Sequence, residues 1–168
     1  CLLSRGLGDV YKRQDDSVDQ IKDCLIDSGL WNAFRTRPFN RTPGINEIPD
    51  AVFINCCDSN PLSIDPYEII LLNKTEFDEG LNVLTDFFRC NINLCYQNDN
   101  FDTSIEKINY YQFKGPHPSG LSSTHISKIY PVNLNRKVWT INYQDIISIG
   151  YLKHCLLYTS DAADDTPC

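Results

Sequence analysis

The sequence predicts an α/β fold, and two observations support that prediction. Three apolar runs of strand length, over 51–57, 91–97 and 138–143, are separated by segments whose apolar residues recur at helical spacing. The run 51–57 is almost continuously apolar, which is typical of a strand that is buried on both faces of a sheet. Strands that alternate with helices favour a three-layer-like domain with a mixed, partly parallel sheet.

The first helix is expected to begin at a capping box. Residues 17–20 (SVDQ) place a hydroxyl N-cap three positions before a Gln, and the apolar residues from Val18 to Leu25 then fall on one helix face. Gly29 suits the left-handed position that follows a helix end. Residues 30–39 mix aromatic and basic side chains. Prolines keep the backbone extended or looped beyond this point, at Pro38, Pro43 and Pro49.

Two further helices follow the first strand. Asp65, Pro66 and Glu68 give the order of an N-cap, a proline at the first helical position and a capping-box acid, so a helix is expected through Leu72. Thr75 is expected to cap the next helix. The remaining segments are expected as strands at 91–97, 108–113 and 138–143, a long polar loop at 115–131, and an apolar stretch of unassigned type at 145–152.

The composition argues against several function classes. The net charge of −7 and the isoelectric point near 4.8 disfavour a nucleic-acid surface, because binding to phosphates requires clustered Lys and Arg. No apolar run approaches the roughly 18 to 20 residues of a membrane span, and no secretory signal can be read. The sequence contains no Met and begins with Cys1, so we expect it to be a fragment of a longer protein.

Both ends are expected to be artefacts rather than natural protein sequence. Residues 9–14 (DVYKRQ) can be encoded by a short DNA element whose opposite strand, read one base along, encodes the CLLYTS of residues 155–160. This inverted pair resembles translated sequencing-library adapter, so residues 1–14 and 155–168 are excluded from fold reasoning. The α/β domain is then expected over 15–154.

Five cysteines remain between these ends, and we expect them to be small buried apolar residues in a reducing compartment. Their odd number and irregular spacing form no disulfide framework, and no CxxC pair supports a zinc or iron–sulfur site. His117 and His125 lie in the expected 115–131 loop without an evident third ligand, so no metal site is expected. The Gly-rich fingerprints of dinucleotide and P-loop sites are also missing.

The loop around Asp58 and Asn60 is one place where a ligand could bind. It follows the buried strand 51–57, and ligands of open α/β sheets bind beyond the carboxyl ends of the strands. The same residue types also dominate turns, where their side chains bond to local backbone, so a simple Asx turn is the alternative.

A second candidate is the cluster of Trp31, Arg35, Arg37 and Phe39. Arg supplies forked donors to carbonyl, carboxylate or phosphate oxygens, and aromatic faces stack on planar rings. A planar molecule that bears oxygen atoms, such as a quinone or a flavin, would suit that pairing. The alternative is an exposed, solvated arginine pair beside a packed aromatic residue.

Several sequence blocks stand in a fixed order along the chain: SGLW at 28–31, RTRPF at 35–39, DSNPL at 58–62, GPHPSGL at 115–121 with Thr124 and His125, and INYQD at 141–145 with Gly150. Together they closely resemble the A subunit of the Na⁺-translocating NADH:quinone reductase family, in the order and similar spacing of that family. The resemblance covers nearly all of 15–154. The sequence departs from the family at Cys56-Cys57, where cysteine is unusual, and around His125 at Ser122-Ser123 and Ser127-Lys128. The family commonly has a histidine at position 127, so its replacement by Ser127 weakens any paired-histidine site.

The resemblance implies a membrane-associated complex that passes electrons from NADH through FAD, FMN and an iron–sulfur centre to ubiquinone while it exports Na⁺. The A subunit is then expected at the cytoplasmic face of the bacterial inner membrane, touching the membrane only through partner subunits and binding none of those cofactors itself. The implied fold is like that of the flavin-binding subunit of respiratory complex I. It is incomplete here, because family members carry domains on both sides.

The resemblance also implies a role in quinone binding or access. The residues expected to face the quinone headgroup or the neighbouring membrane subunit are Trp31, Arg35, Arg37 and Phe39, with His117 and His125 next. One alternative is a purely structural assembly subunit that contacts no substrate. Another is an active flavin or NADH module, against which the missing glycines argue. The isolated fragment is expected to be inactive.

Overall fold

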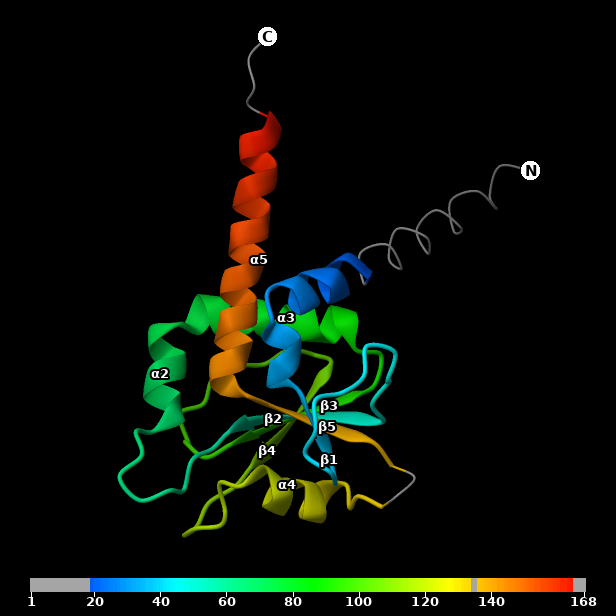
Figure 1. Ribbon diagram of the computed structural model, residues 1–168. Coiled ribbons are helices and arrows are strands. Elements are labelled where there is room, and N and C mark those ends of the chain that lie inside the picture. Colours follow the sequence, from blue (N-terminus) through cyan, green and yellow to red (C-terminus); the bar gives the residue numbers. More distant parts are fainter. Residues whose placement is uncertain (1–18, 134–135, 165–168) are drawn as a thin grey trace, which may run out of the picture.

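The protein folds around a mixed five-stranded sheet (Figure 1). The computed structural model describes residues 19–133 and 136–164, and of residues 155–164 only the helix that contains them. The order of strands in the sheet is β1 (Arg35–Arg37), β5 (Val138–Asn142), β2 (Ala51–Cys56), β3 (Asn91–Tyr96) and β4 (Ile108–Gln112). The last four are parallel to one another, and β1 at the edge is antiparallel to β5. The predicted α/β class and partly parallel sheet are confirmed.

Helices cover both faces of the sheet, which gives three layers (Figure 1). On one face lie a helix over 19–27, α3 (Lys74–Phe87) and α5 (Tyr143–Asp164). The shorter α4 (Ser122–Ile129) lies on the other face, and α2 (Pro66–Leu72) sits beside α3 and α5. Each face of the sheet therefore buries its own apolar side chains.

The adjacent cysteines Cys56 and Cys57 show how the sheet divides the core. Cys56 belongs to the apolar cluster on the α3 and α5 face, whereas Cys57 packs with Phe53 and Ile126 on the α4 face. Successive side chains alternate across a strand, so this division is the one expected. Both thiols and that of Cys95 are buried, as predicted for all five cysteines of 15–154, whereas Cys24 and Cys90 are only partly buried.

Two predicted helix ends are confirmed. The helix over 19–27 ends before Gly29, whose φ of +78° is in the left-handed region that favours glycine. The Asp65 carboxylate accepts a hydrogen bond from the Tyr67 amide at 3.0 Å and so caps α2. The predicted contribution of residues 17–18 to the first capping box lies outside the described residues.

Two local predictions are wrong. The carbonyl oxygen of Asn73 accepts a hydrogen bond from the Phe77 amide at 2.9 Å, so α3 begins directly after Asn73 and Thr75 lies inside the helix. The segment 115–131 is not all loop, because it contains α4. That helix is stabilised by Ile126, which is buried in the apolar cluster on its face of the sheet.

Two stretches for which the sequence predicted no particular helix or strand have regular structure. Residues 30–39 contain a 3₁₀ helix, η1 (Leu30–Ala33), followed by the edge strand β1. The apolar stretch 145–152 lies within α5, and its Ile146 and Ile149 are buried against the sheet and α3. Throughout the described part of the chain, no helix combines the length and apolar character needed to cross a membrane.

Candidate functional site

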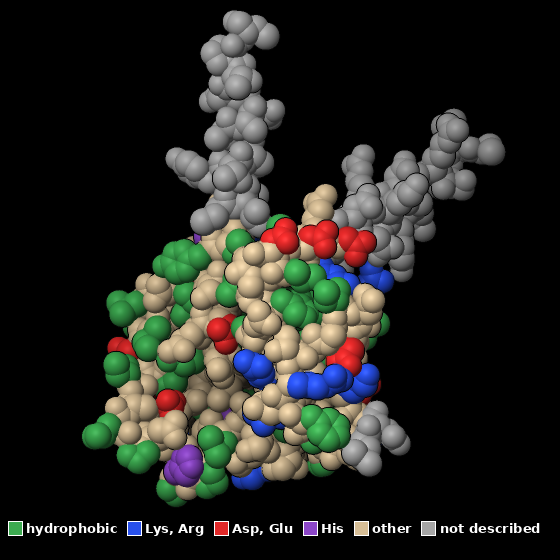
Figure 2. Space-filling model, viewed as in Figure 1, with side chains coloured by type: hydrophobic (Ala, Val, Ile, Leu, Met, Phe, Trp, Pro, Cys, Tyr) green, Lys and Arg blue, Asp and Glu red, His purple; other side chains and the backbone are tan. Residues whose placement is uncertain are grey.

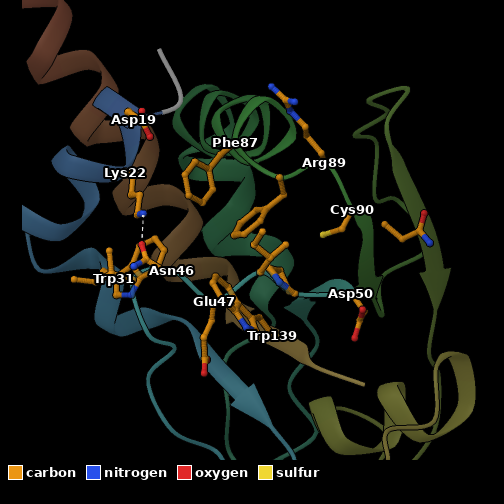
Figure 3. Close-up of a pocket in the computed structure, with 15 residues that line it drawn as sticks. Asp19, Lys22, Trp31, Asn46, Glu47, Asp50, Phe87, Arg89, Cys90 and Trp139 are labelled. Carbon is orange, nitrogen blue, oxygen red and sulfur yellow. Dashed lines mark hydrogen bonds between the residues drawn. The ribbon is translucent and has the colours of Figure 1, made fainter. Parts of the chain in front are cut away.

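A cavity of about 770 Å³ opens where the parallel strands begin (Figure 3). Its walls come from separate parts of the chain: the helix over 19–27, the loop 45–50, the residues 87–91 that link α3 to β3, and the two tryptophans Trp31 and Trp139. This volume falls within the roughly 300–1,000 Å³ of small-molecule sites. A ligand could therefore be enclosed between the loop and the end of α3.

Aromatic rings form the apolar part of the wall. The Trp31 ring meets that of Phe87 edge-on, with centroids 6.1 Å apart, and that of Trp139 at 5.7 Å. The Trp31 indole Nε1 donates a hydrogen bond to the carbonyl oxygen of Pro43 at 3.0 Å, which fixes the ring. Edge-to-face contacts of this kind hold the rings at defined angles. The cavity thus has a preorganised aromatic surface.

The Trp139 indole differs from that of Trp31. Its Nε1 is buried and has no hydrogen-bond partner among the described residues. The ring is enclosed by the rings of Trp31, Phe34 and Phe88, with centroids at 5.6–5.7 Å. Trp139 is 1% exposed, so it packs behind the cavity wall and supports the Trp31 ring.

Polar groups surround the opening. Lys22 Nζ donates to Asn46 Oδ1 at 3.4 Å, which joins the first helix to the loop 45–50 (Figure 3). Burial acts to raise the pKa of Glu47, but the Gly44 amide and the charges of Arg41 and Lys137 outweigh it and lower that pKa. Glu47 is thus an anion at neutral pH. Its Oε1 lies 2.5 Å from Arg41 Nη2, and this ion pair holds the carboxylate in place.

Only Trp31 of the predicted arginine–aromatic cluster lines this cavity. On β1, Thr36 pairs with Trp139 and lies on the same face of the sheet as that cavity residue. Arg35 and Arg37 alternate with Thr36 and so project from the other face, away from the cavity. Arg35 Nη1 donates to Thr42 Oγ1 at 3.1 Å, and the buried Nε of Arg37 has no partner within the described residues. Phe39 is 70% exposed in the turn beyond β1. The structure separates these residues into three environments.

The loop at the carboxyl end of β2 has the geometry of an Asx turn, the alternative to a ligand site at this position. Asp58 Oδ1 accepts from the Asn60 amide nitrogen at 2.9 Å and from its side-chain Nδ2 at 2.8 Å. A further contact ties this loop to the 115–121 loop, since Ser59 Oγ accepts from the Gly120 amide at 3.0 Å. Asp58 Oδ1 and the N–H groups of Asn60 are therefore engaged in local bonds.

The two predicted histidines have different surroundings. His117 is exposed, and its Nδ1 lies 3.1 Å from Ser59 Oγ. His125 is buried under α4, and its Nε2 lies 2.7 Å from the Ser119 carbonyl oxygen. Burial lowers the pKa of His125, with Lys128 acting in the same direction. Across residues 19–133 and 136–164, no three His, Cys, Asp or Glu side chains are grouped to hold a metal ion.

Sequence reasoning missed most of the cavity wall. The loop 45–50 contains Ile45 and Ile48, which are 53% and 82% exposed. Apolar residues in a proline-bounded loop were the available signal. The approach of this loop to Phe87 and Cys90 could not be read from spacing. Burial raises the pKa of the Cys90 thiol to about 11, so that this cavity residue carries a protonated, unreactive sulfur at neutral pH.

Comparison with known proteins identifies one family. Residues 16–155 match the family model described as the NqrA second alpha/beta domain. The chain is 44% identical over 140 residues to the A subunit of the Na(+)-translocating NADH-quinone reductase of Glaesserella parasuis serovar 5 (strain SH0165), covering 81% of this chain and 31% of that protein. The subunit of the same name from Klebsiella pneumoniae (strain 342) is 43% identical over 136 residues, covering 80% of this chain and 30% of that protein. The one from Neisseria gonorrhoeae (strain NCCP11945) is 45% identical over 138 residues, covering 81% of this chain and 31% of that protein.

The match covers most of this chain and a minor part of each relative. The chain spans about 31% of the length of the relatives that it matches. The rest of each relative's sequence lies outside the match. The α/β architecture with a partly parallel sheet agrees with the description of the matching family. On these grounds, the chain belongs to the family of NqrA second alpha/beta domains.

Proposed function

We propose that this chain is a domain of the peripheral A subunit of a Na⁺-translocating NADH:ubiquinone oxidoreductase, and that it contributes to quinone binding or access. Electron transfer from NADH to ubiquinone, coupled to Na⁺ export, would belong to the whole complex. The fragment alone would be inactive. Support for membership in the complex comes from the relatives, each of which is named as the A subunit of a Na(+)-translocating NADH-quinone reductase.

The aromatic cavity is the observation that carries the quinone part of the proposal. A quinone headgroup is a planar ring with two carbonyl oxygens. The rings of Trp31 and Phe87, with Trp139 packed behind them, form an apolar wall for such a ring, and Lys22 and Asn46 offer polar donors at the opening. Arg35, Arg37 and Phe39 would then face a neighbouring subunit rather than the headgroup, and His117 and His125 would stabilise the loop at the opposite end of the sheet.

The rest of the machinery would lie outside this chain. FAD, FMN, the iron–sulfur centre and the NADH site would belong to other subunits, which are the proposed partners together with ubiquinone. The domain would sit at the cytoplasmic face of the bacterial inner membrane and reach the membrane only through those subunits. The proposal includes no binding of nucleic acid, because the chain carries a net charge of −7.

Narrowing the cavity in the complete complex tests the quinone site. Ile45 lines the cavity and is half exposed, so Ile45→Trp adds bulk without entering the core. We expect the apparent KM for ubiquinone to rise about tenfold, a loss of ~1.4 kcal/mol of binding, with NADH oxidation by an artificial acceptor unchanged. The matched control is Asn82→Trp on the exposed side of α3.

An unchanged KM in Ile45→Trp would refute the cavity as the quinone site. If Arg35→Ala or Arg37→Ala raised the KM instead, the quinone contact would lie along β1. Photolabelling of the complex with a quinone analogue gives a second readout, in which label is expected on the peptides that contain Trp31, residues 45–50 or residues 87–91.

A purely structural role is the second candidate, and one observation favours it. The outer side of α2 exposes leucine side chains to solvent, as interaction surfaces do. If the domain only supports assembly, Ile45→Trp would dissociate the complex or have no effect. The quinone kinetics of the complex that survives would then be unchanged.

A further inference from the structure

The outer side of α2 and the loop before it form an exposed apolar surface, which we call the α2 patch. It consists of Leu62, Ile64, Leu71 and Leu72, with exposed fractions of 104%, 68%, 52% and 84%. Hydrophobic side chains gather on the side of the molecule where α2 lies (Figure 2). Single exposed apolar residues are ordinary, but four within eleven residues of sequence form a group that points to a binding surface.

The sequence of α2 itself implies a covering partner. Its inner side is already apolar, with Pro66 and Ile70 buried against the rest of the domain. Leu71 and Leu72 extend the apolar surface to its outer side. A helix that is apolar on opposite sides is typical of one enclosed by protein, whereas a surface helix has one polar face. Among the described residues, protein contacts enclose only the inner side of α2.

Backbone conformation also holds the patch outward. Leu62 has φ of +65°, in the left-handed region that residues with a Cβ rarely adopt, and its side chain is fully exposed. A turn that needs positive φ favours Gly or Asn. A fully exposed leucine in this conformation gains nothing within the domain that offsets its strain, which favours a compensating contact outside the domain.

The charges around the patch indicate the chemistry of its partner. Residues 58–72 contain Asp58, Asp65 and Glu68 and no Lys or Arg. The next lysine, Lys74, is engaged with the Asp102 carbonyl oxygen at 2.7 Å and with Thr103 at 3.1 Å. An acidic surround is repelled by the anionic lipids of a membrane surface. It fits a protein segment whose apolar residues are flanked by Lys or Arg.

We propose that the α2 patch is the docking surface for another domain of the same polypeptide. Relatives are about three times as long as the matched region, since this chain covers 31% of them, so most of the polypeptide lies outside the domain described here. A domain joined by a linker binds at high effective concentration, so a patch of modest size suffices. This inference uses the family assignment and is independent of quinone binding.

Site-specific photocrosslinking in the full-length NqrA protein tests the proposal. Leu62→benzoylphenylalanine and Leu72→benzoylphenylalanine would be made in that protein, which would be purified without its partner subunits and again within the complex. We expect an intramolecular crosslink in both preparations, mapped by mass spectrometry to a peptide outside the region that corresponds to residues 16–155. That peptide should contain Lys or Arg beside apolar residues.

The matched control is Asp86→benzoylphenylalanine on α3, where the side chain is 68% exposed and lies outside the patch. It should give no such crosslink. Crosslinks from Leu62 and Leu72 only to other subunits, only to lipid, only to a second copy, or to nothing would each overturn the proposal. A complex that keeps its quinone kinetics while these crosslinks fail would leave the proposed function standing and refute this inference alone.

Discussion

His125 shows how one buried side chain holds the loop 115–121 against α4. Its Nε2 lies 2.7 Å from the Ser119 carbonyl oxygen, and because that oxygen can only accept, Nε2 must carry the proton. The imidazole also packs on the Phe113 ring, with centroids 4.2 Å apart. Burial lowers the pKa of His125 below its usual 6.5. The folded state therefore holds the neutral imidazole.

This predicts a loss of stability in weak acid. Between the lowered folded pKa and the unfolded value near 6.5, the unfolded chain binds more protons at this site, so the free energy of unfolding falls as pH decreases through that window. His125→Gln keeps a donor for Ser119 and removes the titration. Urea unfolding at about pH 7.5 and about pH 5.5 should show a smaller difference for His125→Gln than for the unmodified chain. Equal differences would contradict the assigned role.

Residue types alone predicted some of the candidate site and not the rest. Asp65 was identifiable as a cap because N-caps obey local geometry, and the turn at Asp58 and Asn60 was identifiable as an alternative for the same reason. Trp31 stands close to Arg35 in sequence. That proximity could not reveal that the Trp31 and Arg35 side chains lie on different sides of the sheet. Side-chain direction follows from strand register, which tertiary structure sets.

At the scale of elements, segments with a clear cap or a continuous or periodic apolar pattern were predictable, and segments without either were not. The buried strand β2 and the helix α3 have apolar patterns of sufficient length. The eight-residue α4 begins with Ser-Ser-Thr, residues of weak helix propensity, and only Ile126 and Ile129 indicate an apolar face. Its packing on the sheet outweighs its propensity, so local sequence could not reveal it.

The crossing of α3 and α5 depends on two glycines. A Cβ at Gly80 would overlap the carbonyl oxygen of Ile146, and one at Gly150 would overlap that of Glu76. Backbone atoms cannot rotate away as a side chain can. Gly80→Ala or Gly150→Ala should therefore lower the free energy of unfolding by about 1–3 kcal/mol or more, which denaturant titration would measure.

Gly44→Ala is the control for this crossing. A Cβ there would lie 3.4 Å from Cγ of Glu47, a flexible side chain that can adjust. We expect a change within about 0.5 kcal/mol. A loss in Gly80→Ala as small as that expected for Gly44→Ala would show that the helix crossing tolerates a methyl group and would contradict the role given to close backbone approach.

At the scale of the whole molecule, the order of strands decides where the cavity forms. β5, the last strand in sequence, lies between β1 and β2. That insertion brings Trp139 beside Trp31, although the two residues belong to opposite ends of the domain's sequence. The α/β class could be predicted from alternating elements, but the insertion depends on long-range pairing and leaves no local signal.

The expectation that residues 1–14 and 155–168 derive from adapter DNA stays a prediction, and it makes a physical claim about the whole molecule. The core side chains that the structure describes on α5 include Ile146 and Ile149, which lie within 15–154. If both tails are artefacts, a chain trimmed to 15–154 should unfold within about 0.5 kcal/mol of the full chain in urea. Sequencing the genomic locus outward from codons 15 and 154 should replace both tails with other codons in an open reading frame. A tail found intact in the genome would show that it is natural sequence. A loss of unfolding free energy well above that margin on trimming would show that the tails contribute to the fold.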